Sequence, residues 1–282
     1  MVEIPQYHNY NDERRLAILD NSSIAFLESM DRYSIRTNEV LKDYDAILIP
    51  LWVWREVKTS DYRLNYIERL INTKIPIYLI DETSYPVLAK EEEGHLFSIV
   101  KASMHYLPEM LKYLKKHVET DDVLDLPDAK EWLQKLYKEW PLSNIDDSGL
   151  QERKPNAGEI SIAILAIILL CYYPEIEILT IYSQDRDTYR FHGNAKNVLE
   201  KDKNFFADNI PAVAYKSNDV ILQQLYMNDL IELNDVNTIR KDSRVVLYTK
   251  HQEDCSTYLI KDKLDNRQFI ELIQNKNVHI IF

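Results

Sequence analysis

The stretch Leu16-Ala17-Ile18-Leu19-Asp20-Asn21-Ser22-Ser23 joins a short apolar run to an acid and then to small polar residues. An apolar run of this length, bounded by turn-forming residues, is typical of a buried strand. Asp, Asn and Ser favour the helix N-cap that would follow. We therefore expect a strand over 16–19 and a helix over 23–30, with Asp20 between them.

The same pattern of an apolar run and an acid recurs near residue 180. Ile178-Leu179-Thr180-Ile181-Tyr182 is strand-like and runs into Ser183-Gln184-Asp185-Arg186-Asp187. In an open α/β sheet, residues beyond the carboxyl ends of the strands face the crevice in which ligands bind. Asp20 and Asp185 are therefore expected at the same edge of one sheet.

Two glutamates are expected on helices that begin at this edge. A buried strand over 46–49, stopped by Pro50, leads into a helix over 51–57 that contains Glu56. Glu159 opens the apolar helix over 160–173. We expect both glutamates in the first turn of their helices, where the helix dipole favours a carboxylate.

Four carboxylates in one crevice repel one another unless cations lie between them. Mg²⁺ and Mn²⁺ prefer carboxylate and water oxygens, so either ion would suit such a site. The predicted catalytic and metal-binding residues are Asp20, Glu56, Glu159 and Asp185, with Asp187 as a further metal ligand.

Each of these acids also has a purely structural interpretation. Asp20, Asp185 and Asp187 could simply cap the helices that follow them. Glu159 could be the capping-box partner of Asn156, three residues before it. Glu56 could be an exposed helix residue. These alternatives stay open at the level of the sequence.

The rest of the chain predicts an α/β fold with additions. Helices are expected over 35–45 and 62–73, a strand over 75–80, another over 212–215, and a helix from about 217 to 227. Residues 82–150 predict a helical insertion, with helices over 95–118 and 128–139. The tail predicts strands over 244–248, 256–260 and 278–282, with a helix over 267–274. The expected architecture is a three-layer α/β/α domain over 1–235 with a mostly parallel central sheet, followed by a β-β-α-β extension over 236–282.

Composition narrows the functional classes. The chain has 282 residues, a formal net charge of −12 and two cysteines. Nucleic-acid binders are usually basic, so the acidic total weakens non-specific binding but leaves room for a local basic rim. Neither a secretory leader nor a disulfide framework is visible, which favours a reducing cytoplasm. The apolar run over 160–173 is too short to span a bilayer, so no membrane partner is expected.

The acids and their settings resemble the PIN domain family of metal-dependent nucleases, over about 16–80 and 155–232. Four motifs carry the resemblance and occur in the family's order: Leu19-Asp20-Asn21-Ser22-Ser23, the strand–Pro–helix at Ile49-Pro50 with Arg55-Glu56-Val57, Ala157-Gly158-Glu159-Ile160, and Asp185-Arg186-Asp187 after Leu179-Thr180. Asn156 departs from the pattern, because many relatives carry an Asp there. The insertion is also larger than in the small toxin-like members.

The resemblance implies an endoribonuclease that uses Mg²⁺ or Mn²⁺ to activate water. It implies RNA as the partner and is compatible with a homodimer, a protein regulator, and a role in a toxin or phage-defence system. An alternative is a catalytically degenerate PIN-like scaffold that binds protein or RNA. Residues expected to bind substrate lie near the acids in sequence: Ser22, Arg55, Lys58, Ser183, Arg186 and Arg190. Trp52 and Trp54 could stack bases or simply pack against the core.

Overall fold

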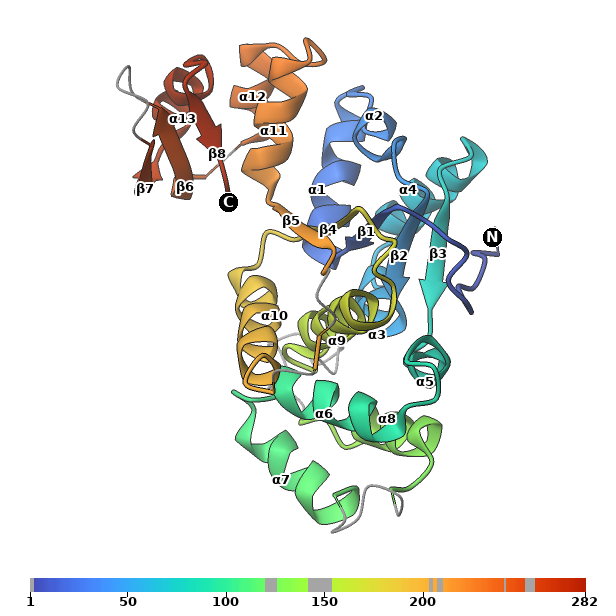
Figure 1. The fold of residues 1–282 in the computed structure, drawn as a ribbon. Helices are drawn as coiled ribbons and strands as arrows, with labels where there is room; N and C mark the ends of the chain where they lie inside the picture. The colour runs from blue at the N-terminus through green and yellow to red at the C-terminus, as the bar shows by residue number, and fades with distance from the viewer. Residues whose placement is uncertain are drawn as a thin grey trace.

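A five-stranded parallel sheet forms the centre of the molecule (Figure 1). The computed structural model describes residues 3–119, 126–141, 154–202, 205–206, 210–240, 242–251 and 257–282. The strand order is β3-β2-β1-β4-β5, and all four neighbouring pairs are parallel. The strands are β1 Arg15–Leu19, β2 Ala46–Pro50, β3 Ile77–Ile80, β4 Ile178–Tyr182 and β5 Ala212–Lys216. The predicted α/β class and mostly parallel sheet are confirmed.

The inner strands read as continuous apolar runs because helices cover the sheet. In Figure 1, α1 (Asn21–Arg32) and α11 (Asn218–Met227) lie above the sheet, while α9 (Ala157–Tyr172) lies below it. All five residues of β2 are buried, as are the last four of β1. The helix α9 is apolar on nearly every side because it packs against α3 (Leu51–Val57), α6 (Glu93–Ser103) and α10 (Arg186–Leu199) as well as the sheet.

The segment expected as an insertion is helical, but its first helix is not continuous. In place of one helix over 95–118, α6 ends at Ser103 and α7 spans Pro108–His117. Pro108 explains the break, because proline has no N–H to donate and disfavours helical backbone in the residue before it. Leu107 accordingly has φ −113° and ψ 81°. The helix α8 spans Ala129–Lys138, and residues 120–125 and 142–150 of the expected insertion lie outside the described residues.

The helix expected over 35–45 is also shorter than predicted, because α2 spans only Asn38–Leu41. The residues after it are held by tertiary contacts in place of helical hydrogen bonds. The Asp45 carboxylate accepts the backbone N–H groups of Arg14 and Arg15, both at 2.8 Å. The Tyr44 hydroxyl lies 3.0 Å from that of Tyr182. These contacts bring the chain to the start of β2 in an extended form.

The remaining elements complete the core and the tail. The helix α4 (Asp61–Asn72) packs against α1. After β3, the short helices η1 (Glu82–Ser84) and α5 (Tyr85–Leu88) lead into α6, and α12 (Leu233–Ile239) follows α11.

The tail forms a separate antiparallel sheet of order β7-β6-β8. Its elements are β6 (Arg244–His251), β7 (Thr257–Leu264) and β8 (Val278–Ile280), with α13 (Asn266–Ile273) between β7 and β8 in the chain. The domain boundary near residue 235 stays a prediction.

No helix in the described ranges is both long enough and apolar enough to cross a membrane.

Candidate functional site

The strand order reverses between β1 and β4, and the site is built at that point. Chain order runs outward from β1 through β2 to β3, and then returns to the other side of β1 with β4 and β5. Ligands bind at such switch points in open α/β sheets, because the connections leave a crevice beyond the carboxyl ends of the strands. Asp20 follows β1 here, and its backbone N–H donates to the Tyr182 carbonyl at the end of β4, at 3.0 Å.

Asp20 is a buried carboxylate, with 5% of its surface exposed. One oxygen, Oδ1, accepts the Asn21 N–H at 2.7 Å, which caps α1. The other, Oδ2, accepts the Ser22 hydroxyl at 2.6 Å and the Ser183 hydroxyl at 2.9 Å. Burial raises the pKa of Asp20, as does the charge of Asp185, while these hydrogen bonds lower it. Asp20 therefore caps α1 and also interacts electrostatically with Asp185.

Glu56 lies near the end of α3, so its predicted place in the first turn is wrong. The helix has only seven residues and begins directly at the end of β2, which leaves Glu56 sixth. The glutamate reaches the site through Asn21, whose side-chain amide donates to Glu56 Oε2 at 3.2 Å. The Asn21 side-chain oxygen in turn accepts from Arg63 on α4. Asn21 thus links the acid of α3 to a cation of α4.

Glu159 lies in the first turn of α9, as predicted, but the capping box with Asn156 is absent. Asn156 has a left-handed backbone, φ 61°, and its side chain makes no capping hydrogen bond. The Glu159 carboxyl is largely buried, and its Oε2 has no hydrogen-bond partner in the described part of the chain. Burial raises the pKa of Glu159 to about 8, and the charges of Asp20, Glu56 and Asp185 add to that rise.

Gly158 brings the start of α9 close to α3. A Cβ at this position would lie 3.3 Å from Val53 Cγ2 and 3.5 Å from Glu56 Oε1. The missing side chain therefore leaves room for the Glu56 carboxylate beside the helix that carries Glu159.

Asp185 and Asp187 differ in what they face. Asp185 caps α10, since its Oδ1 accepts the Asp187 N–H at 2.8 Å, and its charge raises the pKa values of both Asp20 and Glu159. Asp187 forms an ion pair with Arg190 at 3.3 Å. Asp20, Glu56 and Asp185 therefore lie within electrostatic range of Glu159, although Glu56 is exposed, whereas Asp187 is paired with a neighbouring cation.

The residues expected to bind substrate are dispersed. Ser22 and Ser183 both donate to Asp20, and Ser183 Oγ also accepts the Asp185 N–H at 3.0 Å. Arg186 extends toward the C-terminal sheet, where it donates to the Val245 carbonyl at 3.1 Å. Lys58 is exposed just beyond the end of α3.

The other two expected substrate-binding arginines contact aromatic rings. The Arg55 guanidinium lies 4.3 Å from the centre of the Tyr137 ring of α8, and that of Arg190 lies 5.1 Å from the Tyr106 ring. Cation–π contacts of this kind hold a guanidinium against the protein surface. Arg55 is thus engaged with α8, part of the segment expected as an insertion.

Both tryptophans of α3 pack in the core. Trp52 and Trp54 are buried, and the Trp52 ring lies 4.8 Å from that of Tyr137 and 5.4 Å from that of Trp140. Of the two interpretations that the sequence allowed, the packing one holds, because neither indole has an open face for a base.

One buried acid near the sheet edge was not among the predicted site residues. Glu82 follows β3, is 2% exposed, and accepts the Trp52 N–H at 3.0 Å and the Ser161 hydroxyl at 2.6 Å through Oε1. Burial raises its pKa to about 8. The signal was the pair Asp81-Glu82 directly after the strand expected over 75–80, but Glu82 was expected to begin the helical insertion.

The donor set fits a hard divalent cation, although the acids are not arranged as a finished coordination sphere. Carboxylate oxygens are the protein ligands that Mg²⁺ and Mn²⁺ prefer. In the described part of the chain, Glu159 Oε2 has no hydrogen-bond partner, and Asp20 Oδ1 has one lone pair beyond its bond to Asn21. Within the described ranges, however, no three His, Cys, Asp or Glu side chains are grouped closely enough to hold an ion as they stand.

A scan against protein-family models and a search of curated proteins both found no match to this chain.

Proposed function

We propose that this protein is a PIN-like, metal-dependent nuclease that hydrolyses phosphodiester bonds, with RNA as its substrate. The observation that carries the proposal is the Glu159 carboxyl. Its Oε2 is buried and lacks a partner in the described part of the chain, and burial, followed by the charges of Asp20, Glu56 and Asp185, raises its pKa to about 8. A bound divalent cation would explain why four acids lie near one another, because its positive charge offsets the repulsion between their carboxylates.

Asp20 and Glu159 would be direct ligands in this proposal, with Glu56 and Asp185 completing the negative set. When bound, Mg²⁺ or Mn²⁺ would supply an activated water and neutralise charge on the scissile phosphate. The protein's own contribution is positioning. Ser22 and Ser183 fix the Asp20 carboxylate through Oδ2, and Asn21 fixes Glu56. The three-layer PIN-like arrangement is part of the same proposal, as are the predicted cytoplasmic location, homodimer and protein regulator.

The first test is cleavage of mixed single-stranded and structured RNA in Mn²⁺. Wild-type protein should cleave, EDTA should stop cleavage, and Asp20→Asn or Glu159→Gln should reduce the rate by at least about a hundredfold, the scale expected when charge stabilisation in the transition state is lost. The matched control is Asp81→Asn. Asp81 also follows a parallel strand and caps the next helix, but it is not among the four acids.

Calorimetry of Mn²⁺ binding gives a second readout that does not depend on turnover. Glu159 is mostly protonated at about pH 7, because its pKa is raised to about 8, and a carboxylate must lose its proton to bind a metal. We expect proton release on binding, visible as a dependence of the heat on the buffer, and its loss in Glu159→Gln. No cleavage together with no Mn²⁺ binding would contradict the proposal and favour the alternative of a catalytically degenerate scaffold.

A further inference from the structure

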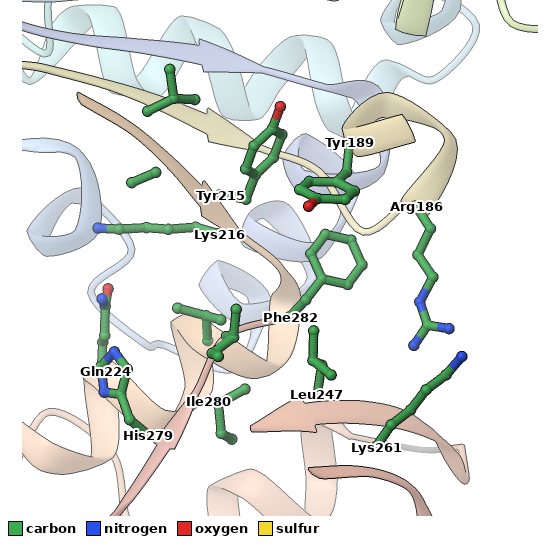
Figure 2. Close-up of a pocket in the computed structure, with 14 residues that line it drawn as sticks. Arg186, Tyr189, Tyr215, Lys216, Gln224, Leu247, Lys261, His279, Ile280 and Phe282 are labelled. Carbon is green, nitrogen blue, oxygen red and sulfur yellow. The ribbon is translucent and has the colours of Figure 1, made fainter. Parts of the chain in front are cut away.

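A half-open pocket of about 640 Å³ lies between the core and the C-terminal sheet. It is lined by the edge strand β5, the first turn of α10, part of α11, and residues of β6, β7 and β8 with the segment that follows β8. Figure 2 shows Phe282 near its centre, with Leu247 and Ile280 below and Tyr189 and Tyr215 above. The pocket therefore combines two parts of the chain that the sequence presents as separate.

The lining of this pocket is basic in an acidic protein. The chain as a whole has a formal net charge of −12, yet no acidic side chain lines the pocket among the residues that the structure describes. Arg186, Lys216, Lys261 and His279 all contribute to it. A concave surface with charge of one sign raises the local concentration of ligands of the opposite sign, so an anion is the expected occupant.

Arg186 and Lys261 are the cations placed to meet a ligand. Figure 2 shows their charged groups on the same side of Phe282, pointing toward each other. The Arg186 guanidinium is held by its bond to the Val245 carbonyl at 3.1 Å and lies 5.9 Å from the Phe282 ring centre. Lys216 points elsewhere, because its ammonium donates to the Tyr182 hydroxyl at 3.3 Å.

The space beside these cations is aromatic. Tyr189 is 57% exposed, and its ring meets that of Tyr215 edge to face at 5.0 Å. In Figure 2 its ring lies next to that of Phe282. Exposed aromatic rings beside a cationic group are the combination with which proteins bind the bases and phosphates of a single strand.

The pocket also adjoins the acid site. Arg186 is the first residue of α10, and Asp185, the residue directly before it, caps that helix. The Ser183 N–H donates to the Lys216 carbonyl at the end of β5, at 3.2 Å, which joins the acid site directly to the strand that lines the pocket. The acid site and the pocket therefore share the segment from Ser183 to Arg186 and its contact with β5.

We propose that this pocket binds a nucleotide of a single-stranded nucleic acid beside the acid site, with its phosphate between Arg186 and Lys261 and its base against Tyr189 and Phe282. This inference rests on the proposed function for the identity of the strand. It assigns to the C-terminal sheet a direct part in substrate binding, independent of the acids.

The test measures binding without cleavage. A labelled single-stranded RNA of about ten nucleotides, within the usual range of single-strand sites, is titrated with protein in EDTA and followed by fluorescence anisotropy over a series of salt concentrations. Arg186→Gln/Lys261→Gln should weaken binding by about tenfold or more. It should also reduce the slope of log K against log salt by about 0.7, the value for one lost phosphate contact to a single strand. Tyr189→Leu should weaken binding by about tenfold with the slope unchanged, because stacking involves no phosphate.

The matched control is Lys263→Gln/Arg267→Gln, which removes the same charge from β7 and α13 outside the pocket. It should change the affinity by less than about twofold, since surface charges away from the phosphates add little. Equal weakening by both double variants would overturn the proposal, and so would equally tight binding of a free mononucleotide. Thermal unfolding of each variant verifies that it folds.

The two proposals fail in distinguishable ways. Asp20→Asn/Asp185→Asn should abolish cleavage in Mn²⁺, while RNA should bind this variant in EDTA at least as tightly as it binds the wild type, because two negative charges near the strand are removed. Binding with the expected variant pattern but no cleavage by the wild type would contradict the nuclease and preserve the pocket. Cleavage by the wild type together with unchanged binding by Arg186→Gln/Lys261→Gln would preserve the nuclease and contradict the pocket.

Discussion

At the scale of single residues, the sheet edge holds carboxyl groups that pay a desolvation cost. Burial is the largest cause of the raised pKa of Asp20, Glu82 and Glu159 alike. Glu82 differs from the other two in having no acid of the proposed metal site among the causes of its shift, and it hydrogen-bonds to Trp52 and Ser161. A substitution of Glu82 therefore measures how burial of a carboxyl group affects stability, without disturbing the proposed metal ligands.

Glu82→Gln should make stability less dependent on pH. The folded protein keeps the Glu82 proton up to a pKa of about 8, while the unfolded chain loses it near 4.5. The contribution of Glu82 to stability should thus be fully present below about pH 4.5 and be lost as the pH rises toward 8. The variant keeps the Oε1 acceptor and carries no charge, so at about pH 9 it should be more stable by on the order of 3 kcal/mol.

Urea unfolding of Glu82→Gln and wild type at several pH values measures this difference. The two proteins should have similar stability at about pH 4, where both side chains are neutral. A constant difference at every pH would show that Glu82 has the same pKa in the folded and unfolded states, contrary to the expectation. The pH dependence that Asp20 and Glu159 contribute is shared by both proteins and cancels in the comparison.

At the scale of elements, glycine-to-alanine substitutions on two neighbouring helices distinguish the effect of helix propensity on stability from that of close packing. Gly193 lies within α10, and a Cβ added there meets no atom within 4 Å. Gly158 lies in the first turn of α9, where a Cβ meets Val53 Cγ2 at 3.3 Å and Glu56 Oε1 at 3.5 Å. The same substitution therefore has different consequences at the two positions.

Gly193→Ala should stabilise the protein by about 1 kcal/mol, the difference in helix propensity between the two residues. Gly158→Ala should gain less or lose stability, because overpacking costs about 1–3 kcal/mol and offsets the gain. Denaturant unfolding at one pH measures both values. An equal gain at both positions would mean that α3 moves away from α9 freely, and that the close approach at Glu56 is not held by packing.

At the scale of the whole molecule, a buried arginine ties the C-terminal sheet to the core. Arg240 is 0% exposed and donates to the Asp219 carboxylate of α11 at 3.0 Å. It also donates to the Leu264 carbonyl at 3.1 Å, and its guanidinium lies 4.4 Å from the Phe269 ring centre. One side chain thus contacts α11 of the core and both β7 and α13 of the tail.

Arg240→Ala should destabilise the protein by about 3 kcal/mol, because it leaves the Leu264 carbonyl without its donor and removes one of the two arginines paired with buried Asp219, while Arg244 still pairs with it. Arg267→Ala should cost less than about 0.5 kcal/mol, since that arginine pairs with Glu271 on an exposed face of α13. Hydrogen exchange should show the loss of protection concentrated in β6, β7 and β8 for Arg240→Ala. Uniform loss over the whole chain would contradict this role as a link between two parts.

The sequence alone determined the elements whose signals are local. The strand and acid at 16–20, the strand at 178–182 and the apolar helix from Glu159 onward follow from residue type and spacing, because propensity and burial act over a few neighbours. Pro108 could also have located the break between α6 and α7, since its effect on helix geometry is local. The parallel sheet followed from strands that alternate with helices.

Only the tertiary structure decided which side chains meet. Glu56 reaches the acids from the end of a short helix because Asn21 bonds to it and Gly158 leaves room, and no spacing in the chain encodes either contact. Arg186 extends away from Asp185, its neighbour in sequence, because the Val245 carbonyl of β6 accepts its hydrogen bond. Residues adjacent in sequence have backbones that lie side by side. The direction of a long side chain depends instead on partners that folding brings from elsewhere in the chain.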